Sequence, residues 1–177
     1  LLNTTNDVPA AFSLLSPQDS TEVTTLTPLL DWATAVDPDP LDTVRYTLYY
    51  GVMIPDLQMV SLDTATSYQV PTDLLDNTTY YWRVVANDLN GASTENTSGY
   101  HSFRVNTVND LPGDFALISP EDSSMVTDLT PTIHWEVPID PDDLDRSITS
   151  YHVYLDTSLI GMIPDTVTTN SYTASTL

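Results

Sequence analysis

Apolar and polar side chains alternate along several short segments of the chain, as they do in half-buried β-strands. In residues 45–51, RYTLYYG, this alternation predicts one inward set: Tyr46, Leu48 and Tyr50. In residues 80–86, YYWRVVA, it predicts a second inward set: Tyr80, Trp82, Val84 and Ala86. Further large inward groups are expected at Leu30 and Trp32, and at Ile133 and Trp135.

The segments between these strands favour the same fold class. They are short, rich in Thr, Tyr, Val and Leu, and separated by Pro, Asp, Asn and Gly, and none has helical periodicity. The pattern predicts an all-β protein.

An internal repeat sets the expected domain organisation. Residues 6–32 align without gaps with residues 109–135, and beyond a two-residue insertion YTLYYG matches YHVYLD and TSYQV matches NSYTA. A period of about 100 residues is typical of tandem independent domains rather than of a continuous solenoid. We expect residues 1–5 to end a preceding repeat or linker, residues 6–107 to form a first domain, and residues 108–177 to form a second.

The second copy stops at Leu177, before any counterpart of NTTYYWRVVAND. We therefore expect a segment cut from a longer array, whose second domain lacks its last two strands. A sandwich without those strands exposes an apolar edge, so they would be disordered, supplied by a neighbouring chain, or outside this segment.

The strand motifs resemble those of the fibronectin type III family. The resemblance rests on Trp32 and Trp135 at the end of the second strand, on YTLYYG, and on LLDNTTYYWRVVAND, which is similar to the family's corner leading into the sixth strand. It implies tandem Ig-like sandwiches of seven strands, with Leu74 and the Tyr80 hydroxyl at the corner, and no particular activity. Asp76 stands where the family often has proline.

A shorter likeness concerns the segments that lead into each repeat. TNDVP, residues 5–9, and VNDLP, residues 108–112, resemble the linker of cadherin-like tandem repeats, in which an Asn-Asp pair before proline helps to bind calcium between domains. The further acidic and asparagine positions of that linker are filled here by Asn106, Thr107 and Leu111.

The charge narrows the classes of partner. Four arginines and no lysine stand against 25 acidic residues, which gives a net charge of -21. Nucleic acid is excluded as a partner because phosphate binding needs a basic face, and an anionic membrane surface is disfavoured. Bound cations or salt would relieve the self-repulsion of such a chain. There is no cysteine, and no apolar run is long enough to span a bilayer.

Two crowded acidic loops are the main candidate site, AVDPDPLDTVRY at residues 35–46 and PIDPDDLDRSITSY at residues 138–151. In the family topology each loop shares one end of its domain with the entry segment and the loop between the sixth and seventh strands. The predicted metal ligands of the first repeat are Asp7, Asp37, Asp39, Asp42 and Asp88, with Asn90 beside them; those of the second are Asn109, Asp110, Asp140, Asp142, Asp143 and Asp145. This supply of oxygen ligands suits calcium as a cofactor better than magnesium.

The loop prolines Pro38 and Pro141 would hold alternate carboxylates in place before an ion arrives. Two alternatives remain open. Asp-Pro and Asp-Asp also form ordinary turns whose side chains cap backbone amides, and an acidic surface without lysine also fits a saline habitat in which no specific site exists.

We predict no catalytic activity. The glycine-serine elbow, the His-Glu-x-x-His motif and glycine-rich phosphate loops are all absent. The three histidines, His101, His134 and His152, are expected to face outward, and the repeat replaces two of them by Asp31 and Thr47.

An exposed aromatic face is a second candidate site, formed by Tyr49, Tyr81, Arg83 and Tyr154. Such residues serve as binding contacts for sugars or proteins, although cross-strand pairs are the ordinary alternative. The expected function is a non-catalytic extracellular or cell-surface spacer or adhesive module, stiffened by calcium, whose partners are neighbouring repeats and a surface protein or glycan. The alternatives are a glycan-binding accessory region of a secreted polysaccharide-degrading enzyme and a subunit of an extracellular filament.

Overall fold

The computed structural model describes residues 5–39, 42–142, 148–156 and 163–175. The chain divides into two compact units, residues 1–108 and residues 109–177. The described residues of both units form strands and loops without any helix, which confirms the all-β prediction.

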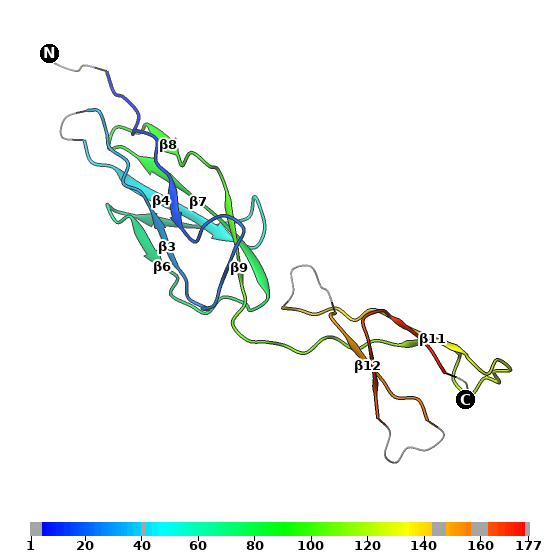
Figure 1. The fold of residues 1–177 in the computed structure, drawn as a ribbon. Helices are drawn as coiled ribbons and strands as arrows, with labels where there is room; N and C mark the ends of the chain where they lie inside the picture. Colours follow the sequence, from blue (N-terminus) through cyan, green and yellow to red (C-terminus); the bar gives the residue numbers. More distant parts are fainter. Residues whose placement is uncertain (1–4, 40–41, 143–147, 157–162, 176–177) are drawn as a thin grey trace. The chain divides into compact units, whose positions relative to one another are not determined.

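Two sheets form the first unit (Figure 1). One sheet has the strand order β1 (Leu14–Ser16), β3 (Leu29–Trp32) and β6 (Ser67–Gln69). The other has the order β2 (Thr21–Val23), β9 (His101–Val105), β7 (Thr78–Asn87), β4 (Arg45–Gly51) and β5 (Gln58–Leu62), with β8 (Ser93–Glu95) also paired to β7. The first strand position of the sandwich is split into two short strands, β1 in one sheet and β2 in the other. The last position is split into β8 and β9, which both pair with β7. Counted in this way, the described strands fill seven strand positions.

The core lies between the two sheets. Every inward residue expected from the alternation in β4 and β7 is buried, as are Leu30 and Trp32 of β3. The rings of Trp32 and Phe12 contact Tyr46 edge-on, with centroids 5.7 and 5.9 Å away. Sequence periodicity was sufficient here because one face of each strand packs against the opposite sheet.

The corner before β7 has the expected contacts. The backbone amide of Leu75 donates a hydrogen bond to the Tyr80 hydroxyl at 2.9 Å, and the Leu74 amide donates to the Leu26 carbonyl at 2.8 Å. Asp76 is used differently from a proline: its carboxylate accepts hydrogen bonds from the Thr107 amide and hydroxyl, at 2.8 and 3.0 Å. The corner therefore also fixes the chain where it leaves β9.

The second unit repeats the pairing of the first. Strands β10 (Leu117–Ser119), β11 (Thr132–Trp135) and β14 (Ser171–Thr173) form one sheet, and β12 (Tyr151–Val153) pairs with β13 (Asp165–Val167). Leu117 lies opposite Trp135 as Leu14 lies opposite Trp32, and the register shifts at the same point in both pairs. Trp135 is buried, but Ile133, expected to be inward, is only partly buried.

The expectation for one histidine was wrong. His134 and His152 are exposed, but His101 shares the inward face of β9 with Phe103 and Val105 and is half-buried. Its ring meets Trp82 edge-on at 6.1 Å. Three consecutive residues of β9, Phe103, Arg104 and Val105, are buried, which obscures the alternation in this strand.

Candidate metal centre

Three segments meet at one end of the first unit. They are the entry segment, the loop from β3 to β4, and the loop from β7 to β8. The Ala10 amide donates to the Val36 carbonyl at 2.8 Å, and the Thr94 hydroxyl donates to the Pro9 carbonyl at 2.6 Å. These contacts bring acidic residues that are far apart in sequence to the same place.

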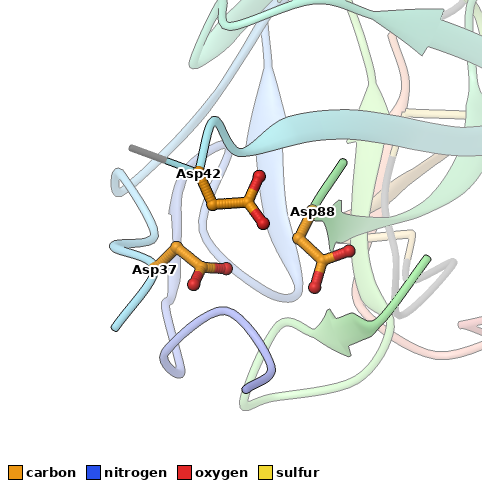
Figure 2. A group of neighbouring side chains, drawn as sticks. All are labelled: Asp37, Asp42 and Asp88. Carbon is orange, nitrogen blue, oxygen red and sulfur yellow. The ribbon is translucent and has the colours of Figure 1, made fainter. Parts of the chain in front are cut away.

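The carboxylates of Asp37, Asp42 and Asp88 form a cluster at this end (Figure 2). One oxygen from each lies within 4.8 Å of the other two. Calcium binds its ligands at about 2.3–2.6 Å, so two oxygens on one ion lie at most roughly 5 Å apart. The spacing of the cluster is therefore compatible with a single calcium ion.

Asp88 is the buried member, with 7% of its surface exposed. Burial pushes the pKa of its carboxyl upward, but hydrogen bonds from Asn6 and from the amides of Ala92, Gly91 and Asn90 outweigh it, so that the pKa lies below its usual value. The Asn6 amide donates at 2.8 Å, and the positive φ of Gly91, 97°, permits the tight turn around Oδ1. Asp88 is thus held as an anion.

Asp42 joins the two loops of the site. Its Oδ1 accepts hydrogen bonds from the amides of Thr43 and Leu89, at 2.8 and 3.1 Å, and its Oδ2 accepts one from the Asn90 side chain at 2.9 Å. This carboxylate is therefore positioned by the loop after β7 as well as by its own.

The two oxygens of Asp37 differ. Its Oδ1 caps the turn by accepting the Asp39 amide at 2.8 Å, as an aspartate before proline commonly does. Its Oδ2 is buried and accepts a hydrogen bond from no described residue. A buried carboxylate oxygen without a donor is costly, and a cation is one partner that would satisfy it.

The other predicted residues of the first unit lie around the cluster rather than in it. Asp39 turns its carboxylate to the entry segment and accepts the Asp7 amide at 2.7 Å, while the Asp7 side chain is exposed. Asn90 contacts Asp42, as described above. Asn6 was missed in the first repeat, although its counterpart Asn109 was named in the second; the gapless repeat alignment was the signal that could have found it.

The second unit has the same loop geometry. The Asp142 amide donates to Asp140 Oδ1 at 3.0 Å, and the Asp110 amide donates to the Asp142 carboxylate, as the matching residues do in the first unit. A pocket of about 360 Å³ lies here, lined by Asn109, Pro112, Asp140, Asp142, Ile148, Thr149 and Ser150. Asp143 and Asp145 lie outside the described residues. The second copy ends before the position of Asp88.

No family model and no curated protein matches this chain. Among solved structures, the sixth fibronectin type III domain of human fibronectin type III domain containing protein 3 aligns at 18% identity and a TM-score of 0.43, over 64% of this chain and 98% of that domain. A two-domain fibronectin type III segment of chicken tenascin aligns at 18% identity and 0.35, over 96% of this chain and 83% of that one. An alpha-L-rhamnosidase from Dictyoglumus thermophilum aligns at 14% identity and 0.43, over 65% of this chain but 15% of the enzyme.

The strand order and the Tyr80 corner decide the fold of the first unit. It is a fibronectin type III-like β-sandwich. The resemblance predicted from the sequence is thereby confirmed as a fold, whereas the cadherin-like linker stays a prediction. Likenesses of this strength carry no argument about ligand or activity.

The aromatic face of the fibronectin type III-like unit is a packed cross-strand cluster. Arg83 lies opposite Tyr49, with its guanidinium 4.5 Å from the Tyr49 ring centroid and 5.3 Å from that of Tyr100, and it forms an ion pair with Glu95. Tyr81 is half-buried on the same face of β7, and Tyr154 of the second unit is exposed just after β12. One face of Tyr49 is therefore covered by Arg83.

Across the described ranges, the structure contains no helix that is long and apolar enough to cross a membrane.

Proposed function

We propose that this chain is a non-catalytic spacer module of an extracellular or cell-surface protein, and that its acidic loops bind calcium. The observation that carries the proposal is the cluster of Asp37, Asp42 and Asp88, drawn from two loops of one fibronectin type III-like unit. The Asp88 carboxylate is buried and held as an anion, and one oxygen of Asp37 is buried and accepts a hydrogen bond from no described donor.

Calcium suits these residues because it accepts six to eight oxygen ligands, and the remaining positions can be filled by backbone carbonyls or water. Without an ion, two carboxylates about 4 Å apart near the surface repel by roughly 1 to 4 kcal/mol. The hydrogen bonds to Asp42 and Asp88 keep these carboxylates together in spite of that repulsion. The site is therefore organised before the ion binds.

The spacer role follows from how each acidic loop holds the segment that enters its unit. In the first unit, the Asp7 amide donates a hydrogen bond to Asp39, whose own amide donates to Asp37. In the second unit, the Asp110 amide donates to Asp142, whose own amide donates to Asp140. An ion bound to either loop would restrict that entry segment. Calcium would thereby limit the freedom of the chain between successive repeats, which otherwise move relative to one another by default.

The direct test is titration of the full chain with calcium in a calorimeter, after treatment with EDTA. We expect saturable binding that is weakened at least roughly tenfold in Asp42→Asn, since one charged ligand is lost. Asp73→Asn removes the same charge from an exposed position in the loop between β6 and β7, so it should bind as the parent does. No saturable heat in the parent, or equal loss in both variants, would refute the proposed site.

A further inference from the structure

Strand β5 forms one edge of the larger sheet of the first unit, and β4 is the one described strand that pairs with it. It is five residues long, whereas the other edge strands β1, β2 and β6 have three residues each. An edge strand presents a row of backbone N–H and C=O groups with which another strand can pair. Strand β5 is therefore the longest such edge in the described part of this unit.

None of the usual protections of an edge occurs within β5. Its residues, QMVSL, include no charged side chain and no proline, and all five pair with β4 in continuous register. On the outer face Met59 is 61% exposed. On the inner face Val60 and Leu62 pack against the core but are only partly buried. A strand added at this edge would therefore bury apolar surface on both faces.

The charges beside β5 are balanced, although the chain as a whole is strongly acidic. Asp63, which follows β5, forms an ion pair with Arg45 at 3.2 Å, and Arg83, two strands away, pairs with Glu95. The net charge of -21 makes two copies repel each other over most of their surface. This repulsion is weakest at an uncharged edge, and a basic partner would gain little attraction there. The charge distribution thus favours a second copy as the occupant.

The sequence of β5 also suits pairing with itself. A twofold axis perpendicular to the sheet keeps each face on its own side, provided that residues of the same face lie opposite each other. The register that pairs all five residues places the axis at Val60, with Met59 opposite Ser61 of the second copy. The flanking Asp56 and Asp63 then lie beyond the last pairs.

We propose that β5 pairs antiparallel with β5 of a second copy of this chain, about a twofold axis at Val60. The larger sheets of the two first units then form one continuous sheet. Met59 lies opposite Tyr49 on β4, and Tyr49 lies opposite Arg83 on β7, so these three side chains form a strip across the outer face. This strip continues into the second copy through Met59.

Sedimentation equilibrium of the full chain in EDTA measures the association. We expect a monomer–dimer equilibrium that strengthens with added sodium chloride, since salt screens the repulsion between two acidic copies. Met59→Glu should weaken dimerisation by at least roughly tenfold, because a twofold interface contains the added charge twice. Met125→Glu adds the same charge at a side chain of the second unit that is 92% exposed, so it should dimerise as the parent does. Both replaced side chains are exposed, so both variants should melt as the parent does.

Disulfide trapping tests the register. The chain has no cysteine, so each single-cysteine variant reports on one position. Side chains directly opposite in an antiparallel pair have Cβ atoms about 4.5–5.5 Å apart, from which a small shift permits a disulfide. A mixture of Met59→Cys and Ser61→Cys under mild oxidation should therefore give the mixed dimer in excess of the random proportion. Met125→Cys should cross-link only as fast as random collision allows.

Three results would overturn the proposal. One is a parent chain that stays monomeric at every concentration and salt level. Another is a dimer that Met59→Glu leaves unchanged, which would assign association to a different surface. The third is cross-linking of the Met59→Cys and Ser61→Cys mixture no faster than that of Met125→Cys. Because EDTA is present throughout, none of these results depends on the metal site.

Discussion

At the scale of single residues, the acidic loop does two things with one side chain. Asp37 caps a turn with one oxygen, its other oxygen is buried, and its carboxylate lies in the cluster with Asp42 and Asp88. The two readings of the Asp-Pro-Asp sequence, turn former and ligand, are therefore compatible in this structure. The carboxylate that caps the turn is also a member of the cluster.

Asp76 provides a test of stability against pH. Hydrogen bonds from the Thr107 amide and hydroxyl hold the pKa of this carboxyl below its usual value, against a smaller effect of burial. A group with a lowered folded pKa stabilises the fold above its unfolded pKa, near 4, and this stabilisation is lost as the pH falls through the folded value.

We therefore expect Asp76→Asn to be less stable than the parent at pH 7 and to lose less stability as the pH falls below about 4. Chemical denaturation across this pH range measures both effects. Asp73→Asn, at an exposed position three residues earlier, serves as the control. Parallel pH profiles for Asp76→Asn and the parent would contradict the role assigned to Asp76.

At the scale of elements, Tyr80 connects the corner to the core. Its ring stacks on Phe103 at 5.8 Å, and its hydroxyl accepts the Leu75 amide. Tyr80→Phe keeps the ring and removes the acceptor, so the unfolding free energy should fall by about 0.5–1.5 kcal/mol. Urea denaturation measures this change.

Tyr81→Phe is the control for that measurement. Tyr81 lies on the opposite face of β7, half-buried, and the change should shift the unfolding free energy by no more than about 0.5 kcal/mol. An equal loss in both variants would mean that the corner hydrogen bond contributes nothing specific.

The elements also show how far sequence reasoning reaches. The buried sets of β4 and β7 follow from alternation alone, because these strands are long and half-buried. The strand β9 does not: Phe103, Arg104 and Val105 are all buried, so its alternation is obscured, and the phase of His101 was misjudged. The first strand position is split into β1 and β2, and the last into β8 and β9, because these short strands pair with different neighbours. Such pairing between distant segments leaves no signal in the local sequence.

The sequence indicated which acidic residues lie near one another at the candidate site, but not which way each carboxylate points. Topology placed Asp37, Asp42 and Asp88 at one end, and they do lie together. The sequence could not tell that Asp39 faces the Asp7 amide, because that contact joins two segments 32 residues apart. Asn6 was missed although the gapless repeat alignment pairs it with Asn109, which was named in the second repeat.

At the scale of the whole molecule, the proposal concerns the freedom of the chain between the units. If calcium restricts the entry segment of the second unit, small-angle X-ray scattering of the full chain should give a narrower distribution of radii of gyration with millimolar calcium than with EDTA. Sodium chloride at matched ionic strength should not reproduce the change, since screening is not coordination. Identical distributions in calcium and EDTA would contradict stiffening while leaving calcium binding itself intact.

The most direct test of the central claim is thermal unfolding of the full chain in three solutions: EDTA, millimolar calcium, and sodium chloride at matched ionic strength. A ligand at 100 times its dissociation constant stabilises the folded state by about 2.7 kcal/mol, so we expect a rise in melting temperature with calcium alone. Asp37→Asn should abolish that rise and Asp73→Asn should keep it. Equal melting of the parent in all three solutions would contradict the claim, and would leave the aspartates as turn residues facing water.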